Sequence, residues 1–211
     1  MRSDIAIVIG NGESRKHINL QNLTGNITMI GCNAVHRDAI VDYLVCCDYR
    51  MVDEAVRNIN NCQTLIYTRQ EHISKFPNHK NVVRVPEIPY PQIQRIDYDR
   101  NWGSGPYAIL IAANLNFNQY YLLGFDLYGN GNCVNNIYKD TKNYAGSQSH
   151  SIDPSYWIYQ TAKLFTIFNQ KNFFIVNKSQ WKIPEQWNLP NVSFLDIDSF
   201  DTTCINNKYP L

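Results

Sequence analysis

The stretch Ile5-Ala6-Ile7-Val8-Ile9, followed by Gly10-Asn11-Gly12-Glu13-Ser14, decides the fold. Its apolar run is continuous rather than alternating, which is typical of a parallel strand covered on both faces. Glycines permit a tight turn and let backbone amides approach a ligand. A helix after the turn would add N-terminal amides that favour an anion such as phosphate. The stretch therefore predicts a buried strand that ends either in a nucleotide-binding turn or in a plain strand-to-helix turn.

This turn matches neither of the two common phosphate-binding signatures. Arg15 stands where G-x-G-x-x-G has its third glycine, and no Gly-Lys-Ser/Thr follows, as a P-loop requires. A second glycine-rich turn, Gly103-Ser104-Gly105-Pro106, precedes a predicted helix, since proline is favoured in a first helical turn. Either turn alone could be a simple helix start. Together they indicate a site for a ligand that carries both phosphate and hydroxyl groups.

Short apolar runs and helical patterns alternate along the rest of the chain. We expect further strands at 27–32, 43–47, 63–67, 82–85, 119–123, 173–177 and 192–197, and helices at 51–59, 107–115 and 154–169. This alternation predicts an α/β fold with one parallel sheet and helices on both faces. In such sheets ligands bind beyond the carboxyl ends of the strands. Small polar residues or turns stand at five of these ends, which predicts one polar cleft: Gly10-Asn11-Gly12, Asn33, Asp48, Asp126 and Asn177.

Length and composition limit the function classes. The chain has 211 residues, which fits a single domain over 1–211, and its 44% hydrophobic residues exclude wholesale disorder. A net charge of +1 argues against a large phosphate-backbone footprint on nucleic acid. No apolar run reaches the roughly 18 residues of a membrane helix. The six cysteines form no C-x-x-C pair and suit reduced, buried thiols, so we expect a cytoplasmic protein.

The candidate chemistry lies mainly in the second half of the chain. The Asn-, Gly- and Tyr-rich segment of about 127–151 has no periodicity and is expected to form a small lid. Asp126 could accept ligand hydroxyls or cap backbone amides, and Tyr128 and Tyr138 could donate to a phosphate. His150 precedes a predicted helix start and is a candidate general base, because imidazole suits proton abstraction near neutrality. Surface and packing roles remain the ordinary alternatives for these residue types.

The ordered set of motifs resembles glycosyltransferase family 42. These motifs are strand–Gly-Asn-Gly-x-Ser, Cys32-Asn33, Ser104-Gly105 before a helix, Gly124-Phe125-Asp126-Leu127-Tyr128, and His150-Ser151 before a helix. The family comprises bacterial sialyltransferases that use CMP-sialic acid, and the chain also resembles the related domain of flagellin-modifying motility accessory factors. The resemblance covers about residues 5–180. It implies a single Rossmann-like domain of modified A-type glycosyltransferase fold, with a lid and no required metal or other cofactor.

The resemblance also assigns donor-binding roles by motif. Asn11, Gly12 and Ser14, with Gly10 in the same turn, match the loop that holds the nucleotide phosphate and ribose. The other matches are Asn33 for the donor, Ser104 and Gly105 for the cytidine nucleotide, and Asp126 in the Gly-Ile-Asp-Phe-Tyr stretch. Asp48 falls where the sialyltransferases have asparagine and the flagellar relatives often have aspartate. Arg100 matches the family arginine only if one residue is inserted.

For catalysis, the resemblance makes Tyr128 and Tyr138 the tyrosines that bind the phosphate leaving group and His150 the general base. The sequence therefore predicts a metal-independent, inverting transferase that moves a sugar from a nucleotide-sugar to a glycan hydroxyl. Two alternatives stay open: a transferase that acts on a hydroxylated base in DNA, and a non-catalytic nucleotide-binding module. The sugar, the acceptor and any homo-oligomer are left open. The spacing Asp196-Ile197-Asp198 resembles a metal motif, but it lies far from the predicted nucleotide strands, so no metal site is expected.

Overall fold

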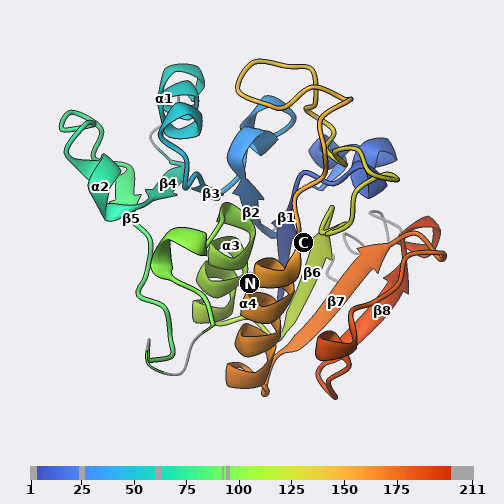
Figure 1. Cartoon of the computed structure of the whole chain (residues 1–211). Coiled ribbons are helices and arrows are strands. Elements are labelled where there is room, and N and C mark those ends of the chain that lie inside the picture. The colour runs from blue at the N-terminus through green and yellow to red at the C-terminus, as the bar shows by residue number, and fades with distance from the viewer. Residues whose placement is uncertain (1–3, 24–26, 60–62, 92, 94–95, 201–211) are drawn as a thin grey trace.

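The computed structural model describes residues 4–23, 27–59, 63–91, 93 and 96–200 (Figure 1). Eight parallel strands form one sheet in the order β5-β4-β3-β2-β1-β6-β7-β8. The strands are β1 (Ile5–Ile9), β2 (Thr28–Cys32), β3 (Tyr43–Val45), β4 (Leu65–Thr68), β5 (Val82–Arg84), β6 (Gln119–Leu123), β7 (Asn172–Asn177) and β8 (Val192–Asp196). The predicted α/β fold with a single parallel sheet is confirmed.

Helices cover both faces of the sheet. The α-helices are α1 (Tyr49–Asn58), α2 (Gln70–Ile73), α3 (Ser104–Asn114) and α4 (Ser155–Ile167). The short 3-10 helices are η1 (Glu13–His17), η2 (Leu20–Asn22), η3 (Asn33–Arg37), η5 (Asp99–Asn101), η6 (Glu185–Trp187) and η7 (Ile197–Ser199). Helices α3 and α4 pack side by side on one face (Figure 1), while α1, η2 and η3 contribute residues to the core on the other.

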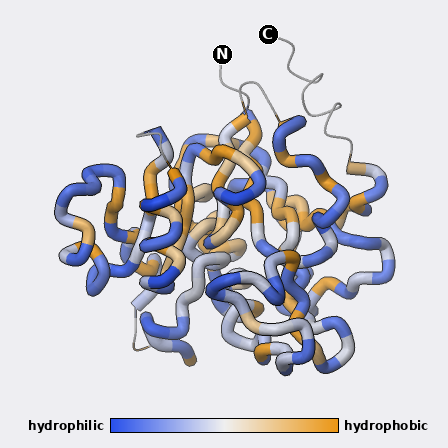
Figure 2. The backbone as a smooth tube through the Cα atoms, turned by 90° about the horizontal axis from the view of Figure 1, so that it is seen from above, coloured by the Kyte–Doolittle hydropathy of each residue, from blue (hydrophilic) through white to orange (hydrophobic). Residues whose placement is uncertain are grey.

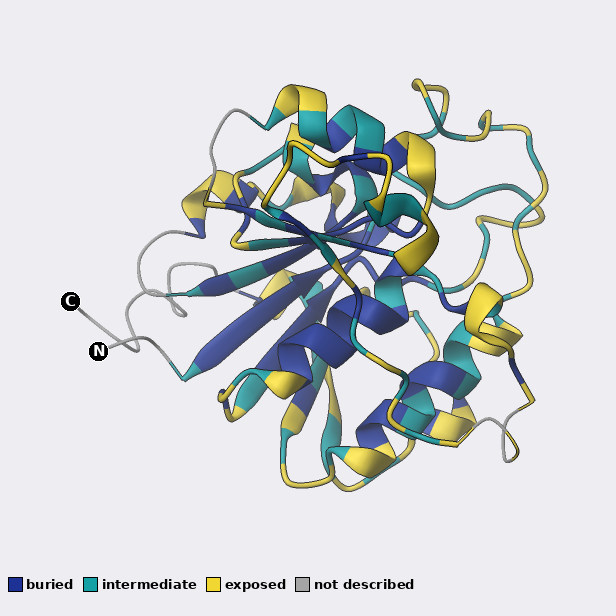
Figure 3. Ribbon diagram, turned by 90° about the vertical axis from the view of Figure 1, so that its left-hand side faces the viewer, coloured by how far each residue is buried: buried dark blue, intermediate teal, exposed yellow. Residues whose placement is uncertain are grey.

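The central strand β1 explains why its apolar run is unbroken. Ala6 and Val8 belong to the core under α3 and α4, whereas Ile5, Ile7 and Ile9 belong to the core on the opposite face. Successive side chains of a strand point to opposite faces of the sheet, so a strand that is buried on both faces needs apolar residues at every position. Figure 2 shows hydrophilic loops around an apolar centre, and Figure 3 shows the middle strands buried along their length.

Two helical details differ from the sequence expectation. The segment after β1 forms the 3-10 helix η1 instead of an α-helix, so no long helix points its N-terminus at this loop. The short helix α2 is not among the helices expected from the sequence. Elsewhere the expected strands and helices are present with ends that differ by a few residues. None of the helices in the described ranges is long and apolar enough to span a bilayer.

The order of the strands fixes where a ligand can bind. From β1 the chain adds β2, β3, β4 and β5 on one side, and then α3 carries it back across to β6 on the other side of β1. The carboxyl ends of β1 and β6 therefore flank the topological switch point, where loops diverge and leave a crevice. We expect the functional site there.

Candidate functional site

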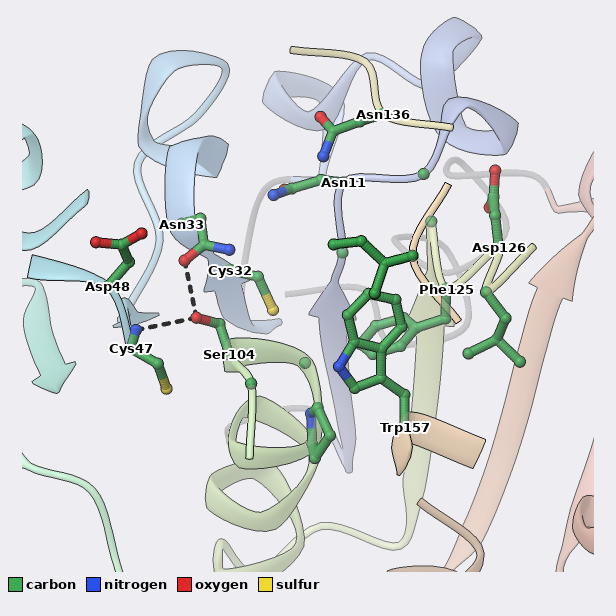
Figure 4. A pocket seen from close by; sticks show the side chains of 18 of the residues that line it. Asn11, Cys32, Asn33, Cys47, Asp48, Ser104, Phe125, Asp126, Asn136 and Trp157 are labelled. Atoms are coloured by element: carbon green, nitrogen blue, oxygen red, sulfur yellow. Dashed lines mark hydrogen bonds between the residues drawn. The ribbon is translucent and has the colours of Figure 1, made fainter. Parts of the chain in front are cut away.

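A cavity of about 740 Å³ lies at this switch point (Figure 4). Its walls come from the ends of β1, β2, β3, β4 and β6, the start of α3, the segment 127–152 and helix α4. Nine of the predicted site residues line it: Gly10, Asn11, Gly12, Asn33, Asp48, Ser104, Gly105, Asp126 and Tyr128. The parallel sheet brings the residues after its strands together because its strands end at the same edge, and the start of α3 adds Ser104 and Gly105.

The floor of the cavity is a close approach between two backbone turns. Gly10 N–H donates to the carbonyl of Leu123 at 2.7 Å, and Gly12 N–H donates to Gly124 at 2.9 Å. A Cβ atom at Gly10 would lie 2.5 Å from the Gly124 carbonyl oxygen, and Gly124 has a φ of +68°. Only glycine fits such a contact and such a φ without strain. The first glycine turn is therefore needed to bring β1 and β6 together.

Asp126 joins three strand ends beneath the cavity. Its carboxylate accepts hydrogen bonds from the backbone N–H of Ser14 at 2.9 Å, from the Ser14 hydroxyl, and from Asn177 Nδ2 at 3.3 Å. Ser14 and Asn177 are buried and stay off the cavity wall. The expectation that Ser14 and Asn177 reach the cleft is therefore corrected: both reach it only through Asp126, because the carboxylate holds them below the wall.

Ser104 connects α3 to the ends of β2 and β3. Its hydroxyl donates to Asn33 Oδ1 at 2.8 Å and accepts from the backbone N–H of Cys47 at 3.0 Å (Figure 4). Asn33 has a φ of 51°, in the left-handed region that asparagine tolerates better than most residues. Because Ser104 holds the oxygen, the carboxamide nitrogen of Asn33 points away from it, and among the described residues it has no acceptor (Figure 4).

The N-terminus of α3 opens onto the same cavity. Gly103 caps the helix without a side-chain hydrogen bond, no acidic residue lies in its first turn, and Ser104 and Gly105 line the wall. The first amides of a helix have no intrahelical acceptor and carry the positive end of the helix dipole. This end of the cavity is thus suited to an anion such as phosphate.

Asp48 lies at the cavity rim and caps α1. Its Oδ1 accepts the Arg50 backbone N–H at 3.1 Å, and the side chain is exposed. Only one carboxylate oxygen is used by the cap. The other remains available to accept a hydrogen bond from a ligand hydroxyl.

The segment 127–151 packs over the first loop. Asn135 accepts from the backbone N–H of Glu13 at 2.8 Å, Ile137 N–H donates to the Asn11 carbonyl at 2.9 Å, and Lys139 pairs with Glu13 at 2.7 Å. Within this segment Tyr128 lines the cavity and is 38% exposed. Tyr128 is therefore a tyrosine that a ligand in the cavity can contact.

Tyr138 is placed differently from our expectation. It is buried, accepts a hydrogen bond from Arg15 Nη2 at 2.9 Å and donates to Asp38 Oδ2 at 2.5 Å. Burial raises the pKa of its hydroxyl further above the usual range. Arg15 also donates to the Gly10 carbonyl at 2.6 Å, so its guanidinium is occupied by contacts within the protein behind the loop. Tyr138 therefore stabilises the first loop from behind and does not reach a ligand in this conformation.

His150 and Arg100 also lie off the cavity wall. His150 is exposed and bridges Cys133 through the backbone, although the next residues, Ser151 and Ile152, do line the cavity. Arg100 belongs to a second cavity of about 510 Å³, which shares Arg69 and Glu71 with the first. The sequence around both residues has no periodicity, so it could not predict which way their side chains point.

Sequence reasoning missed several residues of the wall. Arg69, Glu71 and His72 line the cavity just after β4, and Trp157 lines it from α4. Arg69 Nη2 donates to the carbonyls of Arg100 and Trp102, both at 2.9 Å, which holds its positive charge at the wall. The strand-end rule could have found the residues after β4, since it applies to every strand of a parallel sheet. Nothing in the sequence singles out Trp157.

Two cysteines complete the wall beside this arginine. Cys32 and Cys47 are free thiols at the ends of β2 and just past β3. Burial raises the pKa of the Cys47 thiol to about 11, although the Ser104 hydroxyl and Arg69 lower it. The thiolate is the nucleophilic form, so Cys47 is a packing residue at neutral pH. Across the described ranges, no three His, Cys, Asp or Glu side chains gather in a way that could hold a metal ion.

Comparison with known proteins gives a result only at the level of structure. No protein-family model matches the chain, and no curated protein matches it by sequence. Among solved structures, the monofunctional α-2,3-sialyltransferase Cst-I from Campylobacter jejuni superposes with a TM-score of 0.61 at 16% identity, covering 89% of this chain and 80% of that one. The chain has the same fold as this sialyltransferase. The expected likeness to family 42 is thereby confirmed for the fold.

Two further structures support the same assignment of the fold. A tyrosine-to-phenylalanine variant of the sialyltransferase CST-II in complex with CMP matches with a TM-score of 0.56 and 17% identity over 83% of this chain and 81% of that one. The MAf glycosyltransferase from Magnetospirillum magneticum AMB-1 matches with a TM-score of 0.57 and 14% identity, covering 97% of this chain but 36% of that one. This sialyltransferase fold is therefore shared with both groups that the sequence resembles.

Proposed function

We propose that the protein is a glycosyltransferase that binds a nucleotide-sugar in the cavity at the switch point. One observation carries the proposal: the glycine turn after β1 and the open N-terminus of α3 face the same cavity. Both features suit a phosphate: the glycine turn lets the backbone come close to it, and the start of α3 offers N–H groups that can donate to it. Two of the structurally similar CstII structures are complexes with cytidine-5'-monophosphate (CMP), which makes a cytidine nucleotide-sugar the first donor to test.

In this proposal, the phosphate lies at the start of α3. The free Asn33 carboxamide nitrogen and the cation of Arg69 provide further donors and charge at the wall. Through its unused carboxylate oxygen, Asp48 accepts a hydrogen bond from a hydroxyl of the nucleoside or sugar. With few cations at the wall, backbone and neutral donors provide most of the phosphate binding.

The proposed reaction proceeds with inversion at the anomeric carbon. An imidazole takes the proton of the acceptor hydroxyl, the acceptor oxygen forms a bond to the anomeric carbon, and the bond from that carbon to the phosphate oxygen breaks. The nucleotide leaves with the electron pair. Tyr128, the accessible tyrosine of the wall, donates to the phosphate as its charge develops.

Two histidines are candidates for the base. His150 is the histidine that matches the family motif, but it is exposed and lies beside the cavity wall. His72 lines the cavity itself. A general base must come within hydrogen-bond reach of the acceptor hydroxyl, and such contacts often tighten only when substrate binds. We assign the role to His150, whose neighbours Ser151 and Ile152 are on the wall, and use His72 as the competing assignment.

We propose a glycan as the acceptor. A CstII structure contains a trisaccharide acceptor together with CMP. In this protein the second cavity adjoins the first at Arg69 and Glu71, so an acceptor chain has room to extend away from the donor. The reaction is proposed to need no metal and to take place in the cytoplasm.

The first experiment is a thermal-shift screen with CMP, CMP-sugars, and UDP-, GDP- and dTDP-sugars, followed by a turnover assay on the best ligand. A ligand that binds only the folded state raises the melting temperature by mass action. Binding followed by slow release of free sugar without acceptor supports a transferase. Tight binding with no turnover under any condition supports a non-catalytic module, and salt-sensitive binding to DNA supports a base-modifying enzyme. No stabilisation by any nucleotide would refute the proposal.

A further inference from the structure

The backbone just before Tyr128 forms a strained turn. Tyr128 N–H donates to the Asp126 carbonyl at 2.7 Å, two residues back, and Leu127 between them has a φ of +64°. A hydrogen bond that closes such a three-residue turn around a positive φ marks the rare, strained form of the γ-turn. Leucine is under steric strain in this region, whereas glycine is not. Strain of this kind persists only where contacts with the rest of the structure hold the turn.

The indole of Trp181 supplies one of these contacts. Its Nε1–H donates to the same Asp126 carbonyl at 2.7 Å, across 55 residues of sequence. The carbonyl oxygen therefore accepts two hydrogen bonds, one from the Tyr128 N–H and one from the indole, which uses both of its lone pairs. The indole thus fixes the atom on which the γ-turn closes.

The same indole lies against the ring of Tyr128. The two ring centroids are 6.3 Å apart and the ring planes are tilted by 41°, an arrangement in which aromatic side chains attract each other. The Tyr128 carbonyl accepts from Asn135 Nδ2 at 3.1 Å. The Tyr128 hydroxyl has no hydrogen-bond partner among the described residues. The direction of this side chain therefore depends on the contacts of its ring and its backbone.

Trp181 is itself held by the last two strands and by η6. It follows β7 in a turn in which its N–H donates to the Lys178 carbonyl at 2.8 Å. Its ring is stacked on that of Phe194 in β8, with centroids 6.4 Å apart and planes tilted by 13°, and lies 6.3 Å from the ring of Trp187 in η6. The half-buried indole also packs against the core on the side of α3 and α4. Its position is therefore set by the sheet, independently of any ligand.

We propose that Trp181 is a positioning residue for the transfer reaction: it holds the turn 126–128 and the Tyr128 ring, and so keeps Tyr128 at the cavity wall where the phosphate leaves. The inference rests on the proposed function. Trp181 lies just past the residues that the family resemblance covers and is not part of the wall, whereas Leu127 and Tyr128 are. Because Trp181 acts through Tyr128, it should affect the step in which charge develops on the phosphate more than it affects donor binding.

The first test measures the release of CMP from CMP-sialic acid without an acceptor, because the bond to the phosphate also breaks in hydrolysis. Trp181→Phe keeps an aromatic ring but removes the N–H donor. It should lower kcat about tenfold and change KM by less than about twofold, as expected for the loss of one hydrogen bond that acts on the leaving group. Trp187→Phe is the matched control, since it also removes an indole N–H that donates to a backbone carbonyl, that of Ile158 at 2.9 Å. The control should leave kcat unchanged.

A double-mutant cycle with Tyr128→Phe shows whether the effect passes through Tyr128. Tyr128→Phe alone should lower kcat about 10²-fold, as expected for the loss of a donor to developing charge. Adding Trp181→Phe to that variant should lower kcat by less than about twofold more, because the hydroxyl that it positions is already gone. An unchanged kcat in Trp181→Phe, or losses that multiply fully in the double variant, would overturn the inference.

A measurement on the free protein separates this inference from the proposed function. Hydrogen exchange of the Tyr128 amide is followed by NMR without ligand in the wild type, Trp181→Phe and Trp187→Phe. The γ-turn should open more often without the indole, so this amide should exchange about tenfold faster in Trp181→Phe alone, while the amides of β6 and β7 stay protected in all three proteins. Unchanged exchange in Trp181→Phe overturns the inference whether or not CMP-sialic acid is hydrolysed. Faster exchange without hydrolysis supports the role of Trp181 in holding Tyr128 and counts only against CMP-sialic acid as the donor.

Discussion

The Ser104 hydroxyl donates a hydrogen bond of 2.8 Å to Asn33 Oδ1, which joins the first residue of α3 to the first residue after β2. The same hydroxyl accepts from the backbone N–H of Cys47, just past β3. One side chain thus sets the position of the helix N-terminus relative to two strand ends. It also leaves the Asn33 nitrogen as the group presented to the cavity.

Ser104→Ala should weaken nucleotide binding about tenfold and destabilise the fold by about 1–3 kcal/mol, because it leaves the Cys47 N–H and Asn33 Oδ1 without their partner. The measurements are calorimetric titration and chemical denaturation. Ser179→Ala is the control, since the side chain of this exposed serine makes, within the described residues, only a long hydrogen bond of 3.5 Å to Gln180. A Ser104→Ala protein with wild-type affinity and stability contradicts the linking role.

Gly10→Ala should destabilise the protein severely. The new Cβ would lie 2.5 Å from the backbone oxygen of Gly124, which cannot move without breaking the pairing of β1 with β6. Overpacking of this kind costs roughly 1–3 kcal/mol or more. Gly146→Ala is the matched control, because its Cβ would have no neighbour closer than 3.5 Å. Equal melting temperatures for the two variants would disprove the close approach.

His150→Ala should lower the transfer rate about 10²–10⁴-fold while donor affinity stays unchanged, as expected for loss of a general base. His72→Ala, measured in the same assay, should have a smaller effect on the rate. The reverse order of the two effects would transfer the role of base to His72, which already lines the cavity.

The docking of segment 127–151 should depend on pH through Glu54. The Arg37 side chain lowers the pKa of this carboxyl, with Asn143 adding to the effect against the opposing effect of burial. A carboxyl whose folded pKa is depressed contributes stability above its unfolded pKa and loses it as pH falls through the folded value. The difference in melting temperature between wild type and Glu54→Gln should therefore be constant near neutrality and shrink below about pH 4.5. A difference that persists unchanged to pH 3 argues against the ion pair.

Chelation of divalent metal with EDTA should leave the initial transfer rate unchanged. The proposed phosphate site uses helix amides, the Asn33 carboxamide nitrogen and the Arg69 guanidinium in place of a metal ion. Steady-state rates with and without EDTA, and with added Mg²⁺ or Mn²⁺, test this directly. A rate that falls on chelation and returns with Mg²⁺ disproves metal independence.

The sequence alone determined the sheet and the edge that carries the site. Continuous apolar runs such as Ile5–Ile9 identify strands buried on both faces, and alternation with helices identifies them as parallel. These are local patterns, set by burial and backbone geometry within a few residues. The strand-end rule then located Asn11, Asn33, Asp48 and Asp126 without any knowledge of their contacts.

Only the tertiary structure decided which side chains of segment 127–151 face the cavity. Tyr128 does so, while Tyr138 turns back to Arg15, 123 residues earlier, and Tyr144 to Asn11, 133 residues earlier. The segment has no repeat that would relate one side chain's direction to the next. The directions follow from hydrogen bonds and ion pairs between distant parts of the chain, and these contacts exist only once the sheet has brought its strand ends together.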